Sequence, residues 1–63
     1  MKKYDLCGVD GNAYSVMGYV TRAVRKEGRS QIEINSYLKD AQSADYDHLL
    51  ATSVVMIDTL NEE

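Results

Sequence analysis

Phenylalanine and tryptophan are absent from this chain of 63 residues, and its aromatic side chains are five tyrosines. The volume of the core must therefore come from valine, leucine, isoleucine and methionine, with tyrosine hydroxyls reaching the surface. A chain of this length buries only about 60% of the surface that its unfolded form exposes. We expect one thinly packed domain without a deep active-site cleft, which a dimer would stabilise.

Cysteine is nearly absent as well. Cys7 is the only one, which excludes an internal disulfide and favours a reducing, intracellular setting. No apolar run approaches the length of a membrane span or of a signal peptide. Proline, internal repeats and low-complexity segments are also lacking. The sequence therefore predicts a single cytoplasmic domain that does not contact a membrane.

Charge is present but unevenly distributed along the chain. Residues 1–32 carry six Lys and Arg against three acids, and residues 33–63 carry one Lys against seven acids, which gives the net charge of −3. Non-specific affinity for a phosphate backbone depends on Lys and Arg. An acidic chain is therefore a poor candidate for binding nucleic acid, and its basic region is local.

The clearest local signal is a junction between two helices. Gly28 can adopt the left-handed conformation that ends a helix, and Ser30 with Glu33 matches the S-x-x-E capping box that begins one. A tight junction of this kind predicts a helical hairpin.

Apolar residues recur at helical spacing in three segments, which predicts helices over about 12–27, 31–42 and 46–60. The residues expected to face the core are Ala13, Val16, Met17, Val20 and Val24 in the first, Ile34, Tyr37, Leu38 and Ala41 in the second, and Tyr46, Leu49, Leu50, Ser53, Val54, Ile57 and Leu60 in the third. Ile32 and Val55 lie off these stripes. The β-branched residues between 54 and 59 leave a late change to strand open, although helix is favoured.

The segment before the first helix is short and mixed in composition. Tyr4, Leu6 and Val9 are expected to pack as an extended segment against the helices, and a short strand paired with the C-terminal tail is the alternative. The predicted fold class is all-α: a small three-helix bundle with a short extended N-terminal leader.

The polar residues match no catalytic or metal-binding pattern. His48 is the only histidine and has no cysteine nearby, so neither a catalytic triad nor a zinc site is indicated. The segment 8–13 lacks the Lys and the Ser or Thr of a phosphate loop, and Tyr14 stands where a calcium loop needs its third ligand. We expect no enzymatic activity, no cofactor and no dedicated metal site.

Two polar clusters are the candidate partner-binding site. In an up-down-up bundle the first and third helices begin at the same end, which would gather one set of side chains there: Asp10, Asn12, Asp45, Asp47 and His48. Helix capping and the helix dipole account for part of this set. A partner's Lys or Arg, or a weakly held divalent cation, could use the remaining groups.

A helix-turn-helix nucleic-acid binder is the alternative function, because the junction at Gly28 also suits that motif. Phosphate contacts would then come from the local basic cluster: Arg22, Arg25, Lys26 and Arg29. The same cations are also typical of a solvated face near a helix C-terminus. The second helix would present a nearly uncharged face to DNA, so a nucleic-acid partner is not expected.

Two segments also carry a resemblance. GVDGNAYSVMG at 8–18 and GRSQIEINSYLKDAQSADYDHLL at 28–50 resemble a family of short, uncharacterised proteins found in bacterial and phage genomes. The resemblance implies a small cytoplasmic helical protein, such as one carried by a mobile element, and it names no catalytic residue or cofactor. With the residues above, it leads us to expect a protein–protein interaction module or small regulator that could self-associate.

Overall fold

Side-chain caps determine where each helix begins. Asn12 Oδ1 accepts a hydrogen bond from the Tyr14 amide at 2.8 Å, which starts α1 at Ala13–Lys26. Ser30 Oγ accepts from the Glu33 amide at 3.3 Å and starts α2 at Gln31–Ala41. The third cap, Asp45, precedes α3 at Tyr46–Asn61. Each cap satisfies an amide that has no partner within its helix.

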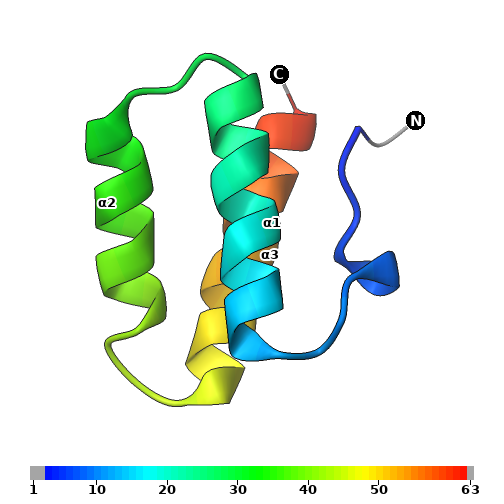
Figure 1. Ribbon diagram of the computed structural model, residues 1–63, viewed down its shortest axis with the longest axis vertical. Coiled ribbons are helices and arrows are strands. Elements are labelled where there is room, and N and C mark those ends of the chain that lie inside the picture. The colour runs from blue at the N-terminus through cyan, green and yellow to red at the C-terminus, as the bar shows by residue number, and fades with distance from the viewer. Residues whose placement is uncertain (1–2, 63) are drawn as a thin grey trace.

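The three helices form an up-down-up bundle in the computed structural model, which describes residues 3–62 (Figure 1). α1 and α3 run in the same direction. α2, which connects them in the chain, runs in the opposite direction. No strand occurs in these 60 residues, and α3 continues as helix through the β-branched residues at 54–57. The predicted fold class, a small all-α three-helix bundle, is confirmed.

The junction at Gly28 is a Schellman motif. Gly28 has a φ of +78°, its amide donates to the Arg25 carbonyl at 3.0 Å, and the Arg29 amide donates to the Val24 carbonyl at 3.2 Å. One part of the predicted capping box does not form, because the Glu33 carboxylate pairs with Arg29 at 2.8 Å. The Ser30 hydroxyl is therefore the side chain that caps α2.

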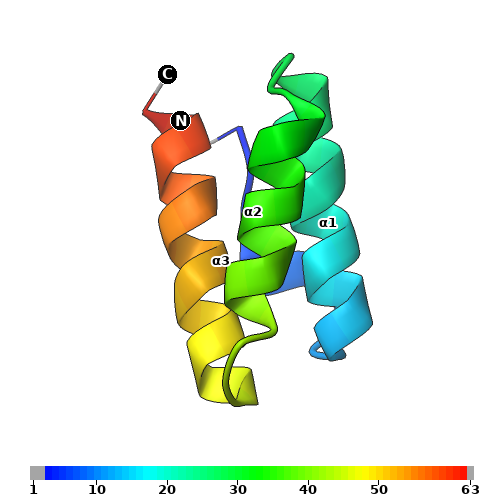
Figure 2. The same ribbon diagram turned by 90° about the vertical axis from the view of Figure 1, so that its left-hand side faces the viewer.

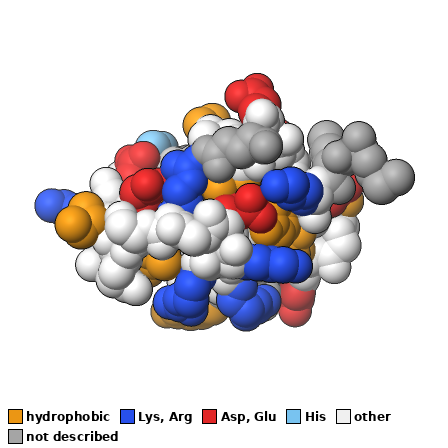
Figure 3. All heavy atoms as spheres, turned by 90° about the horizontal axis from the view of Figure 1, so that it is seen from above, with side chains coloured by type: hydrophobic (Ala, Val, Ile, Leu, Met, Phe, Trp, Pro, Cys, Tyr) orange, Lys and Arg blue, Asp and Glu red, His pale blue; other side chains and the backbone are white. Residues whose placement is uncertain are grey.

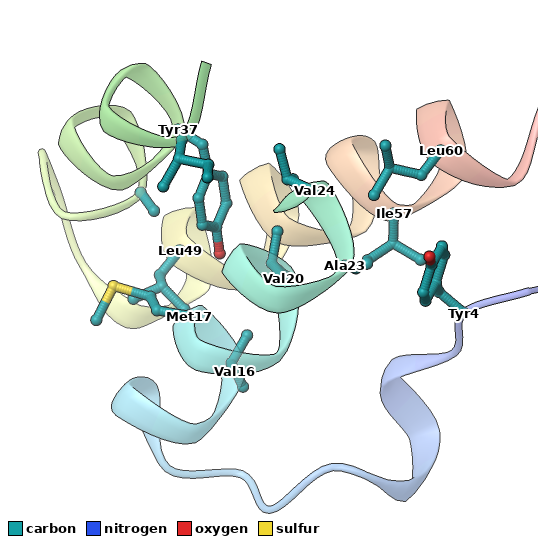
Figure 4. Packing of buried hydrophobic residues seen from close by; sticks show 12 residues of the cluster. Tyr4, Val16, Met17, Val20, Ala23, Val24, Tyr37, Leu49, Ile57 and Leu60 are labelled. Carbon is teal, nitrogen blue, oxygen red and sulfur yellow. The ribbon is translucent and has the colours of Figure 1, made fainter. Parts of the chain in front are cut away.

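The core lies along the axis shared by the three helices (Figure 4). Its centre is aliphatic and includes Val20 and Val24 of α1 and Leu60 of α3, all without exposed surface. Two residues expected in the core stripe of α3 are instead exposed: Tyr46 at 40% and Val54 at 46%. Both lie at the margins of the predicted stripe, where the neighbouring helices no longer cover α3.

The leader packs against α1 and α3 on the side away from α2 (Figure 2). It is not extended throughout, because Leu6–Gly8 forms a single 3₁₀ turn that the Asp5 carboxylate caps by accepting from the Cys7 amide at 2.9 Å. Tyr4 is its buried anchor, while Leu6 and Val9 are half-buried against the core. The alternative of a strand paired with the C-terminal tail is not what the structure shows.

Within residues 3–62, the apolar stretches of the helices are too short to span a bilayer. The longest helix, α3, has 16 residues and an exposed face that carries Asp47 and Asp58.

Candidate functional site

The leader is fastened to the bundle by charged and aromatic contacts. The Tyr4 hydroxyl donates to Glu27 Oε2 at 2.6 Å, and Lys3 Nζ lies 3.1 Å from Glu27 Oε1. The hydrogen bond between the Tyr4 hydroxyl and Glu27 is the largest cause that raises the pKa of Tyr4 to about 12, and burial is the second. The same bond, followed by the one from Lys3, lowers the pKa of the Glu27 carboxyl below its usual value.

The backbone of the leader is held as firmly as its side chains. Asn61 exchanges two hydrogen bonds with the backbone of Tyr4, at 2.9 and 3.0 Å. The Asp5 amide donates to the Tyr19 hydroxyl at 3.0 Å, and the rings of Tyr4 and Tyr19 meet edge to face with centroids 6.4 Å apart. In Figure 4 the Tyr4 ring lies beside Ile57 at this edge of the core. The valley between α1 and α3 is therefore covered by the chain itself.

The residues predicted to form one acidic patch have separate local roles. Asn12 and Asp45 each cap a helix, so their side-chain oxygens are used within the fold. The starts of α1 and α3 do lie at one end of the bundle, as Figure 1 shows. A hydrogen bond from the Tyr46 hydroxyl to the Gly11 carbonyl joins them.

His48 and Asp10 face different parts of the surface. His48 Nε2 lies 3.0 Å from the Asp40 carbonyl oxygen and 3.2 Å from Asp40 Oδ1, so it ties the start of α3 to the end of α2. Asp10 instead lines a polar hollow of about 530 Å³ beside the leader, and Arg22 is also among its lining residues. Asp47 is exposed in the first turn of α3. Asp10 and His48 thus line different hollows, and the expected residues do not form one site.

A second hollow of about 620 Å³ runs between α2 and α3. At one end lies the Arg29–Glu33 ion pair, and at the other lies the Asp40–His48 contact. Between these polar ends the lining is largely apolar or small: Ser36, Tyr37, Ala51, Thr52, Val55, Met56 and Thr59. We call this hollow the α2–α3 groove.

A hydrogen-bonded pair of buried hydroxyls, Tyr37 and Ser53, lies beneath the α2–α3 groove. The Ser53 hydroxyl has one proton and donates it to the Leu49 carbonyl at 2.8 Å. The Tyr37 hydroxyl must therefore be the donor in its 2.6 Å contact with Ser53 Oγ. Burial raises the pKa of Tyr37. Ser53 has no exposed surface, and both hydroxyls are satisfied.

Two apolar side chains noted in the sequence as lying off the core stripes are indeed exposed. Ile32 on α2 is 79% exposed and Val55 on α3 is 65% exposed. Val55 lines the α2–α3 groove, and Ile32 lies on the outer side of α2, one turn from Ser36 in the groove wall. In the sequence, these two apolar positions outside the core stripes were the indication of an exposed apolar surface. The groove itself could not be predicted without knowing how α2 packs on α3.

The residues of the nucleic-acid alternative lie near the end where α1 passes into α2. Seen from above in Figure 3, basic side chains gather at this end with acidic ones among them. Arg22, Arg25 and Lys26 are exposed on α1. Arg29 is half-buried and held 2.8 Å from Glu33. The basic face is thus carried by α1 and does not continue onto α2.

The part of the chain that the structure describes contains no group of three or more His, Cys, Asp or Glu side chains placed to hold a metal ion. Comparisons with protein-family models, with curated proteins and with solved structures found no match. The resemblance carried by GVDGNA and SADYDHLL stays a prediction.

Proposed function

We propose that the protein is a small intracellular interaction module that binds a protein partner in the α2–α3 groove. The observation that carries this proposal is the exposed Val55 in a largely apolar groove whose buried hydroxyl groups are already hydrogen-bonded. An exposed apolar patch with a polar rim is typical of a protein-binding surface.

The groove also suits binding better than catalysis. Its two titratable clusters, Arg29–Glu33 and Asp40–His48, lie at opposite ends and are each engaged internally. A nucleophile, its base and an oxyanion site would have to converge on one point. Polar groups at the rim with apolar groups between them match the requirements of a docking surface.

Two neighbouring valines on α3 provide a matched test. Val55 lines the α2–α3 groove, whereas Val54 lines a hollow beside the leader. The test uses three bait proteins in affinity purifications from the native host: wild type, Val55→Asp and Val54→Asp. Circular dichroism first checks that each variant is folded. We expect a partner recovered by wild type and Val54→Asp to be lost with Val55→Asp. Unchanged recovery with Val55→Asp would contradict the proposal.

The nucleic-acid alternative has weaker support. Arg29, the cation nearest α2, is paired with Glu33, and α2 presents Asp40 at its other end. Acidic groups on the helix that should enter the major groove repel phosphate. We expect no binding of micromolar strength or tighter to random duplex DNA at about 150 mM salt. A fluorescence anisotropy titration checks this, and tight, salt-sensitive binding would favour the alternative.

A further inference from the structure

The dimensions of the α2–α3 groove suit a single helix. Its α3 wall extends from His48 to Thr59, a rise of about 16 Å, or three turns of helix. α2 and α3 run antiparallel, and a helix laid in the valley between two such helices completes a four-helix bundle. Recognition of this kind depends on apolar anchors at helical spacing. Val55 and Met56 on the α3 side supply complementary apolar surface.

Acidic residues lie on the outward face of α3 beside the groove, although none of them lines it, and Asp58 also lines the hollow beside the leader. α3 contains no Lys or Arg, and one exposed stripe follows its outward face in steps of three or four residues: Asp47, Ala51, Val55, Asp58 and Glu62. Residues at such steps lie on the same side of a helix. The stripe is apolar in its middle and acidic at both ends.

The groove-lining residues of the α2 side do not neutralise these acids, because Lys39, the cation of α2, is not among them. The charge of Arg29 is matched by Glu33 at 2.8 Å, and Asp40 adds a carboxylate at the end where His48 lies. A helix seated in the groove therefore meets apolar surface with carboxylates along the outer rim formed by α3. Complementary charge across an interface favours encounter with the correct partner and penalises like charges.

Resting on the proposed function, we infer that the occupant of the α2–α3 groove is an amphipathic helix of another protein, with Lys or Arg on the flank that faces α3. Its apolar residues pack on Ala51 and Val55. Its cations are separated by about three turns of helix, so that they reach Asp47 at one end and Asp58 or Glu62 at the other.

A second copy of this chain fits the groove less well. Packing two α3 stripes together would bring acids from both copies into one interface, where like charges repel. A second copy could offer the cations of α1, namely Arg22, Arg25 and Lys26. Among the described residues of α1, however, Tyr14 is the large apolar side chain that is well exposed. That face offers charge with little apolar surface.

The test uses three synthetic helical peptides of about 18 residues, long enough to form isolated helices. All share one Leu and Ala face, and their flanks carry Lys, Gln or Glu. Each is titrated into isotope-labelled protein while amide shifts are followed. We expect the Lys peptide to shift amides of residues 29–40 and 48–59 and to bind at least about tenfold more tightly than the Glu peptide.

Two protein variants separate charge from shape. Asp47→Asn combined with Asp58→Asn should reduce the Lys–Glu difference severalfold and leave Gln-peptide binding unchanged. Val55→Asp should weaken the Gln peptide, with Val54→Asp as its control. Equal binding of all three peptides in the groove would overturn the charge assignment while leaving the proposed function standing. Failure of every peptide to shift groove amides would overturn the helical occupant, whereas the proposed function is overturned by unchanged partner recovery with the Val55→Asp bait. Val55-dependent dimerisation in sedimentation would assign the groove to a second copy.

Discussion

The two valleys that flank α3 differ in what fills them. On the α1 side the leader lies in the valley, with Tyr4 buried and its backbone tied to Asn61. On the α2 side the valley is open, and its floor is closed by the Tyr37–Ser53 hydroxyl pair. Among residues 3–62, the leader is the segment that covers a valley beside α3. The open side can therefore accept a partner without any part of the fold being displaced.

The largest expected effect comes from introducing a carboxylate at a fully buried position and comparing it with the same change at an exposed position. Val20 has no exposed surface, so Val20→Asp buries an unpaired charge at a cost of several kcal/mol, against a total stability of about 5 kcal/mol. We expect Val20→Asp to unfold the domain and Val55→Asp to leave it folded. Amide dispersion in NMR spectra checks both, and a folded Val20→Asp protein would rule out this packing.

The next effect concerns the covered valley. Tyr4→Ala removes the ring that packs on Tyr19 and the hydroxyl that Glu27 binds. It should lower the thermal midpoint markedly, whereas Tyr14→Ala, at a side chain that is 80% exposed, should change it little. Differential scanning calorimetry measures both. Equal midpoints would mean that the leader contributes nothing to stability.

The floor of the open valley can be weakened from either hydroxyl. Ser53→Ala leaves the Tyr37 hydroxyl buried without an acceptor and should cost about 1–3 kcal/mol, whereas Tyr37→Phe should cost about 1 kcal/mol. Ser53 keeps its bond to Leu49 in the second variant. Denaturant unfolding curves give both values. The reverse order would show that Tyr37 is not the donor.

The smallest effect is a dependence of leader docking on pH. The pKa of Glu27 is lowered on folding, so its contribution is present above its usual pKa of 4.5 and is lost as pH falls through the folded value. The pKa of Tyr4 is raised from 10.0 to about 12, so its contribution is present below pH 10 and is lost as pH rises through 12.

Glu27→Gln should flatten the acid limb of this profile and bring the pKa of Tyr4 back towards 10.0. Thermal midpoints across the acid range and phenolate absorbance across the alkaline range measure the two limbs. An acid limb that survives in Glu27→Gln would assign it to another carboxyl group.

The helices could be predicted from the sequence because their signals are local. Apolar spacing, the Asn12, Ser30 and Asp45 caps and Gly28 act within a few residues of the turn they determine. The docking of Tyr4 could not be predicted in this way. Its partners Glu27 and Asn61 lie 23 and 57 residues away along the chain, and no periodic pattern links such positions.

The candidate site was harder to predict for a related reason. The sequence pattern indicates where the helices end, which predicted Asp10 and His48 in one patch. It does not indicate how each helix is rotated about its axis. The rotation of α3 turns His48 towards Asp40, whereas Asp10 lies in the loop before α1 and lines the hollow beside the leader. The positions of Ile32 and Val55 outside the core stripes were a better indication of exposed apolar surface. The exposure of such a residue does not depend on how the helices are joined.

The two hydrogen bonds between Tyr4 and Asn61 also bring the backbone of the described residues almost into a closed ring. Residues near the two ends of the described chain are held side by side, so a short peptide linker there would close the backbone into a ring. The turn between α2 and α3 is exposed and could then be cut to create new termini. Such a circular permutant would keep every helix and would make the rim of the α2–α3 groove the place where the chain begins and ends.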